Sequence, residues 1–390
     1  MLDESLLDAP ESLARADTRG LLRGAAESGA RVRTAARSAA ESGLSDLRPE
    51  GRPRALLVAG SGPSTGGIAD LLSALGGGNI PVSLIRPGGA LPDPGALLWT
   101  LPGWAGPMDL LLIVTTDGTE PGLSGLVEQA YRRGCSVVTI TPPHSPLTDE
   151  AGGRHGLVVP LVPAPYEETP EDQPLPTTGL WPAAAVEPPG TFWALLTPLL
   201  VLSDRLGLFP AAQPAIQSVA DRLDHAAERC GPAIATYGNP AKTLTAELAD
   251  ALPLLWSEGP AAGAVARHFS RALAAVAGRP ALAAELPDAL SLHGTLLSGV
   301  FAAGADPDDF FRDRVEDPQA LHARVVLLRG QAEPAPHSAM SAARELALTH
   351  DTPVSELEPA GGSSLEAIAE LLAVTDFAAV YLALASGERA

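Results

Sequence analysis

The sequence predicts an α/β protein in which two domains, each a parallel sheet flanked by helices, follow an N-terminal helix. Short apolar runs without polar alternation recur along the chain, as in strands that are buried on both faces. Helix-compatible stretches separate these runs, which is typical of parallel sheets. The order of apolar strand, small-residue loop and helix occurs at residues 54–75 and again at 253–273, which indicates an internal duplication.

In the first half, the N-terminal helix is expected over residues 12–42, where alanines dominate and Gly43 is a suitable stop. A break rich in proline and glycine precedes the first strand. The expected strands are residues 55–59, 82–85, 110–115 and 136–141, with helices at 68–75 and 123–133.

In the second half, residues 151–190 are rich in proline and are expected to form an extended, exposed connector. Ser363 and Glu366 have the spacing of a capping box. The expected strands are 252–256, 325–328 and 354–357, and the expected helices are 191–209, 213–229, 263–277, 339–349 and 365–384. The chain therefore divides into an N-terminal helical segment 1–50, a first domain 51–150, the connector 151–190, a helical linker 191–232 and a second domain 233–390.

Composition narrows the function classes. The 390 residues carry a net charge of −20, which disfavours nucleic acid and anionic membranes as partners. Two cysteines exclude a cysteine-rich zinc site, and the histidines lack metal-ligand spacing, so no metal is expected. The N-terminus lacks a basic region followed by an apolar run, and the apolar stretch 192–209 is interrupted by Pro198 and Asp204. A cytoplasmic protein without a membrane segment is expected.

The first strand is followed by a glycine-rich loop, residues 60–67, which contains Ser61, Ser64 and Thr65. Such a loop between a strand and a helix can hold an anion through backbone N–H groups and the helix dipole. A dinucleotide fingerprint would need a glycine where Thr65 stands, and no lysine follows as a P-loop would require. Two interpretations stay open: an anion or sugar site, or a tight turn with ordinary helix-capping residues.

A second loop, residues 115–121, also lies between an expected strand and a helix, and its hydroxyls are Thr115, Thr116 and Thr119. Hydroxyls suit a phosphate, whereas Asp117 and Glu120 would repel it. The two carboxylates are equally well explained as helix-start residues. Because the carboxyl ends of parallel strands meet at one edge, the two loops are expected to converge there.

The order and spacing of the two loops resemble the SIS (sugar isomerase) domain family, and the bifunctional phosphoglucose/phosphomannose isomerases in particular. That group has a Gly-x-Gly-Gly-Ser loop and a Ser-Tyr-Ser-Gly-Asn-Thr loop, each after a strand. The likeness covers most of residues 50–385 and extends to residues 100–104, 239–242, 285–288 and 376–383.

The resemblance implies two SIS domains, a homodimer and no cofactor. It also implies a sugar phosphate or related small molecule as ligand, with Ser61, Ser64, Thr65, Thr115, Thr116 and Thr119 around the phosphate. In the family a carboxylate base moves a proton between C1 and C2 through an enediol, and a histidine and a lysine assist ring opening.

This chain departs from the family at its catalytic positions. Ala275 stands where the base is expected, and Ser291 stands at the histidine position. The catalytic lysine has no counterpart, because Lys242 is the only lysine and lies in another motif. In the loops, Pro63 replaces a glycine, and Asp117 and Glu120 replace a serine and a threonine.

Three hypotheses follow. The first is a catalytically degenerate SIS protein, a pseudoenzyme of carbohydrate metabolism that binds a sugar phosphate. The second is an active aldose–ketose isomerase with a reassigned base, for which Glu285 and His293 are the candidate catalytic residues. Both residues have simpler explanations, Glu285 as a surface group and His293 as a packed or capping residue. The third is an interaction protein whose acidic, proline-rich connector contacts partners.

Overall fold

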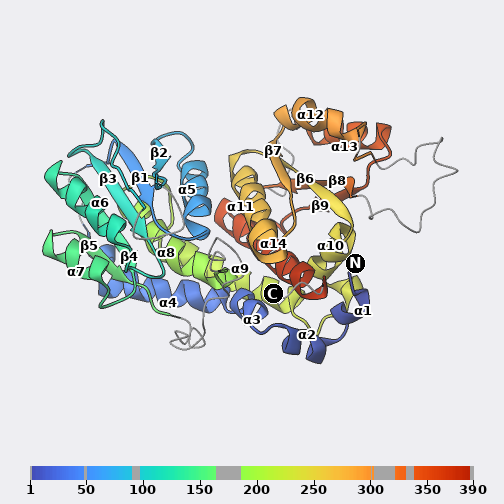
Figure 1. Cartoon of the computed structure of the whole chain (residues 1–390), viewed down its shortest axis with the longest axis horizontal. Helices are drawn as coiled ribbons and strands as arrows, with labels where there is room; N and C mark the ends of the chain where they lie inside the picture. Colours follow the sequence, from blue (N-terminus) through green and yellow to red (C-terminus); the bar gives the residue numbers. More distant parts are fainter. Residues whose placement is uncertain are drawn as a thin grey trace. The chain divides into compact units, whose positions relative to one another are not determined.

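The computed structural model describes residues 2–47, 51–89, 97–163, 186–299, 301–302, 321–330 and 338–386 (Figure 1). Contacts within the chain divide it into two compact units. The first unit is Glu27–Asp221, and the second unit is Met1–Ala26 together with Arg222–Ala390. Each unit contains one parallel sheet, which confirms the predicted fold class.

The first unit holds a parallel five-stranded sheet in the order β2-β1-β3-β4-β5. Its strands are β1 Ala55–Ala59, β2 Val82–Leu84, β3 Asp109–Val114, β4 Ser136–Thr141 and β5 Leu157–Pro160. Every residue of β1 and β3 is buried, because helices cover both faces, and this explains why β1 and residues 110–114 of β3 are continuous apolar runs.

The helices of the first unit are α4 Ser28–Glu41, α5 Ser64–Leu75, α6 Pro121–Arg132, α7 Pro146–Gly153 and α8 Pro189–Arg205. Leu123 and Val127 of α6 pack with Leu57 and Leu111 of the sheet in one buried cluster. Helix α8 packs against α4 and α5. The packing of α8 against α5 is important for the site, because α5 starts at the first predicted loop.

The second unit holds a parallel four-stranded sheet in the order β7-β6-β8-β9. Its strands are β6 Ala251–Glu258, β7 Leu282–Glu285, β8 His322–Arg329 and β9 Val354–Leu357. The helices that cover it are α10 Pro240–Leu248, α11 Pro260–Ala277, α12 Asp288–His293, α13 Met340–Thr349 and α14 Ser364–Ala385. Trp256 of β6 packs with α12 and α13 in one buried cluster, while α11 contacts the strands and α14.

Among the described residues, α14 is the one helix with the length and hydropathy of a membrane span. The apolar stretch considered in the sequence, residues 192–209, does not meet these two criteria. All of the apolar window of α14 is buried inside the unit, as expected for a helix at the centre of a packed core.

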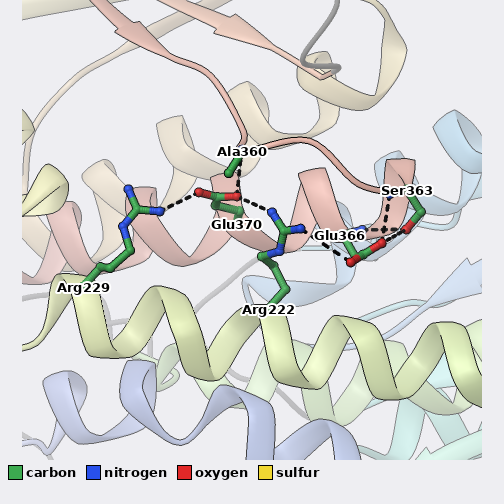
Figure 2. Close-up of polar contacts among 6 residues, drawn as sticks. All are labelled: Arg222, Arg229, Ala360, Ser363, Glu366 and Glu370. Carbon is green, nitrogen blue, oxygen red and sulfur yellow. Dashed lines mark hydrogen bonds and ion pairs between the residues drawn. The ribbon is translucent and has the colours of Figure 1, made fainter.

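The start of α14 is tied to α9 (Gln213–Cys230) by a group of charged side chains (Figure 2). The predicted capping box is present, with Ser363 and Glu366 bonded reciprocally. One turn further on, the carboxylate of Glu370 is 5% exposed and accepts hydrogen bonds from Arg222 at 2.7 Å and Arg229 at 2.9 Å. The N–H of Ala360 donates to the same carboxylate at 3.1 Å.

The predicted N-terminal helix over residues 12–42 is wrong as a single element. The structure has α1 Glu4–Leu7, α2 Pro10–Ala16, α3 Leu21–Ala26 and α4 instead. The carboxylate of Asp17 accepts hydrogen bonds from the N–H groups of Leu21 and Leu22, at 2.7 and 2.9 Å, and Gly20 has a φ of +66°. Asp17 therefore caps the start of α3, and this local bonding competes with a continuous helix.

Two edge strands were not predicted. Strand β5 lies inside the stretch expected to be an exposed connector, yet Val159 is fully buried. Strand β7 has no fully buried residue, so it lacks a strong apolar run. Residues 164–185 of the expected connector lie outside the described residues.

Candidate functional site

The two predicted loops lie together at the carboxyl edge of the first sheet. Strands β1 and β3 are parallel neighbours with Ala59 opposite Ile113, so the segments that follow them start side by side. The hydroxyls of Ser61 and Thr115 are 3.0 Å apart and hydrogen-bonded. The structure thus brings one candidate residue from each loop into direct contact.

The first loop is built on close backbone approaches. A side-chain carbon on Gly60 would lie 1.9 Å from the carbonyl oxygen of Val114 in β3, so only glycine fits there. Gly62 has a φ of +108°, a conformation that favours glycine. The turn then enters α5 at Ser64, which is 6% exposed. Ser64 Oγ donates to Oε2 of Glu187 at 2.5 Å.

Thr65 differs from Ser61 and Ser64, the other candidate residues of this loop, in its hydrogen bonding. Its side chain is 4% exposed, and its Oγ1 has no protein hydrogen-bond partner. This oxygen lies 2.9 Å from the position that a side-chain carbon on Gly60 would take. A buried hydroxyl without a partner is uncommon in proteins, and an unplaced water or a ligand is the usual explanation.

In the second loop, Thr115 is fully buried. Its Oγ1 accepts hydrogen bonds from the backbone N–H groups of Asp117 at 3.2 Å and Gly118 at 3.4 Å. Thr116 and Thr119 are exposed, and Thr119 Oγ1 donates to Asp117 at 2.6 Å. The backbone donors that a phosphate would use are therefore turned towards the chain's own threonine.

Glu120 is the N-cap residue of α6, but its side chain makes no capping hydrogen bond. The carboxylate is buried and accepts a hydrogen bond from the indole N–H of Trp99. Burial raises the pKa of Glu120 above its usual value, and the hydrogen bond from Trp99 opposes that effect. Glu120 thus lies at the start of α6, but its carboxylate binds the indole of Trp99 instead of capping the helix.

The loop edge is therefore a network of hydroxyls and backbone N–H groups closed by two of the chain's own carboxylates, Glu120 and Glu187. Sequence reasoning found the hydroxyls but missed Trp99 and Glu187. Glu187 lies more than a hundred residues from Ser64 in the sequence, and no local pattern connects them. Such an arrangement can orient a hydroxyl-rich ligand, and it can accept an anion only if the carboxylates make room.

In the second unit, the candidate catalytic residues Glu285 and His293 are not brought together. Glu285 ends β7 and accepts a hydrogen bond from Arg267 of α11 at 2.7 Å. His293 ends α12, and its Nδ1 accepts a hydrogen bond from Nε1–H of Trp256 at 2.9 Å. Because Trp256 packs with α12 and α13 while Glu285 faces α11, the two side chains lie on opposite faces of the second sheet.

His293 is a packed histidine with a satisfied Nδ1, as one of the two sequence interpretations expected. Its side chain is 9% exposed, and burial lowers its pKa below the usual 6.5. The unfolded chain therefore binds a proton below pH 6.5 that the folded protein resists, so this group reduces stability as the pH falls.

We expect the stability of the wild type to fall relative to that of His293→Gln when the pH is lowered from about 7.5 to about 5.5, a range that spans the ordinary histidine pKa. The amide oxygen of the variant can still accept from Trp256, but the group no longer titrates. Urea unfolding of both proteins at several pH values measures the difference. A stability difference that does not change across this pH range would show that His293 titrates normally in the fold.

The positions of the family's catalytic groups are also defined. Ala275 lies in the last turn of α11, and Ser291 of α12 donates to the carbonyl of Asp288 at 2.9 Å. Lys242 is fully buried and donates to the carbonyls of Pro232 at 2.8 Å and Ile234 at 2.7 Å. Burial lowers the pKa of Lys242, and the nearby Asp8 opposes this shift.

No group of three or more metal-ligating side chains occurs among the described residues. A hollow of about 810 Å³ opens in the first unit, but it lies at the amino ends of β3, β4 and β5. It is therefore at the edge of the sheet opposite to the two loops.

One family model matches part of the second unit. Residues 238–388 match the family model for the bacterial phosphoglucose isomerase C-terminal SIS domain, which confirms the resemblance to SIS domains. No curated protein sequence matches the chain.

Solved structures share the fold over most of the chain at low identity. A hypothetical protein from Thermus thermophilus has a TM-score of 0.58 at 15% identity, over 98% of this chain and 91% of that one. A proposed phosphosugar isomerase from Silicibacter pomeroyi has a TM-score of 0.55 at 16% identity, over 94% and 97% of the chains. The C-terminal domain of glucosamine-fructose-6-phosphate aminotransferase from Francisella tularensis has a TM-score of 0.50 at 12% identity, over 94% and 96%.

Proposed function

From the match of residues 238–388 to the C-terminal SIS domain of bacterial phosphoglucose isomerases, we propose that this phosphosugar isomerase-like protein binds a sugar phosphate without isomerising it. The observation that carries the proposal is the chemistry at the family's catalytic positions. Ala275 cannot accept a proton, and the hydroxyl of Ser291 is bonded to its own helix. Lys242, the only lysine, is buried, and its ammonium group donates hydrogen bonds to two backbone carbonyls.

The proposed ligand site is the pair of loops at the carboxyl edge of the first sheet. Ligands of open α/β sheets bind at this edge. Ser61, Ser64, Thr65, Thr115, Thr116 and Thr119 supply hydroxyls there, and Thr65 has a buried oxygen without a protein partner. The first SIS domain at residues 51–150, a homodimer and a cytoplasmic location are further parts of the proposal.

We expect fructose 6-phosphate to bind to the purified protein in heavy water without being converted. Enediol chemistry would exchange a proton at C1 with solvent deuterium. The proton NMR signal of C1 should therefore keep its full intensity, and no aldose phosphate should appear. Phosphorus lines should broaden as protein is added, because the bound sugar exchanges with the free sugar. Conversion or exchange would contradict the loss of activity, and phosphorus lines that stay sharp as protein is added would contradict binding.

The alternative is an active isomerase that interconverts glucose or mannose 6-phosphate with fructose 6-phosphate through a reassigned base. Glu285 is the better placed of its two candidates, because it stands at the carboxyl end of a strand and is partly exposed. The same experiment tests it. If exchange occurs, Glu285→Gln should abolish it while His293→Gln should leave it intact.

A further inference from the structure

Glu187 places a carboxylate inside the first loop. Its Oε2 accepts the hydrogen bond from Ser64 Oγ at 2.5 Å. Its Oε1 would lie 2.2 Å from a side-chain carbon on Gly62, so the carboxylate rests against the backbone of the turn that opens α5. α5 has 12 residues, which is long enough for its amino end to attract an anion.

The carboxylate is held there by the fold of the first unit. Glu187 is followed by Pro188 and Pro189, the N-cap and first residue of α8. A residue before proline is restricted to extended conformations, and each proline fixes its own φ. Since α8 packs against α5, Glu187 is carried on a short, stiff segment beside the loop.

The position of this carboxylate is the one that a phosphate would need. Serine hydroxyls and a helix amino end are the donors by which proteins hold phosphate. Here the hydroxyl of Ser64 is already bonded to Glu187. The unpartnered, buried Oγ1 of Thr65 in the next position is independent evidence that the loop is built to meet a group that the chain itself does not supply.

We propose that Glu187 determines the ligand affinity of the first loop, because its carboxylate occupies the phosphate position and must leave before a sugar phosphate can bind. This proposal rests on the proposed function. A carboxylate and a phosphate repel each other at contact distance, so both cannot share the donors of Ser64. Binding of a sugar phosphate therefore moves Glu187 away from the loop, and removal of the carboxylate favours the bound state.

The test compares the affinity of four forms of the 390-residue chain, the wild type and three variants, for fructose 6-phosphate by calorimetry. Glu187→Ala vacates the position, and Glu187→Gln keeps the size of the side chain but removes the charge. Glu128→Gln is the matched control, because it removes one negative charge of the same unit from an exposed ion pair with Arg132 on α6. Thermal unfolding of each variant verifies the fold, and amide NMR shifts of Gly62 and Ser64 report binding at the loop.

We expect Glu187→Ala to lower the Kd for fructose 6-phosphate at least tenfold, Glu187→Gln to lower it less, and Glu128→Gln to leave it unchanged. Equal affinities in all four proteins would overturn the role of Glu187 while the proposed function stands. Weaker binding by Glu187→Ala would show that the carboxylate contacts the ligand, which also overturns the proposal. Absence of binding in all variants, including the vacated loop, would overturn both the proposal and the proposed function.

Discussion

Gly60→Ala is expected to destabilise the protein by about 3 kcal/mol or more, a large effect for the addition of one methyl group. The new carbon would lie 1.9 Å from the carbonyl oxygen of Val114 and 2.9 Å from Thr65 Oγ1. The oxygen of Val114 belongs to the backbone of a central strand, which cannot move without disturbing its pairing with β1 and β4. The substitution should therefore separate the two loops as well as weaken the sheet.

Urea unfolding of the full chain measures this effect, and Gly125→Ala is its control. Gly125 lies within α6, and a side-chain carbon there would meet nothing within 4 Å. Alanine at that position should stabilise the protein by about 0.5–1 kcal/mol, because it has the higher helix propensity. A Gly60→Ala protein as stable as the wild type would mean that β1 and β3 are farther apart at their ends than described.

Glu370→Ala is expected to cost about 3 kcal/mol, near the lower limit for breaking a buried ion pair. The substitution leaves Arg222 without its short contact and the N–H of Ala360 without an acceptor (Figure 2). Arg229 is about two-fifths exposed and can return to water, which limits the loss. Glu366→Ala on the same helix removes the capping box and should cost only about 1 kcal/mol.

The pH dependence supplies a second measurement for Glu370. Burial raises the pKa of the Glu370 carboxyl. The hydrogen bonds from Ala360, Arg222 and Arg229 together lower the pKa by more than burial raises it, so the pKa is below its ordinary 4.5. The stabilisation is therefore fully present above pH 4.5 and is lost as the pH falls through the lowered pKa. The stability difference between the wild type and Glu370→Gln should shrink over that range. A constant difference would contradict the stabilising role of the charge.

Burial on both faces explains which elements could be predicted from the sequence. Strand β1 is apolar throughout and β3 is apolar after Asp109, so the expected bounds 55–59 and 110–115 agree with the structure within a residue. The edge strands β5 and β7 are mostly only partly buried. In addition, β5 lies in a stretch whose prolines indicate a connector. The N-terminal helix was predicted too long, because the alanine-rich pattern hides the caps made by Asp17.

In the candidate site, only the contact between the two loops that follow adjacent strands could be predicted from the sequence. Ser61 and Thr115 follow adjacent parallel strands, so their convergence follows from topology. The contacts of Glu187 with Ser64 and of Trp99 with Glu120 join residues that no periodicity relates. Likewise the choice between a packed and a catalytic His293 depended on Trp256, which reaches it across 37 positions of sequence.

The burial of Lys242 also determines how the protein can be modified. It is the only lysine of the 390 residues, its side chain is fully buried, and its ammonium is bonded to the carbonyls of Pro232 and Ile234. Acetylation, ubiquitin attachment and amine-reactive cross-linking all require an accessible lysine amine. In the folded protein Lys242 therefore offers no accessible amine to any of these reactions.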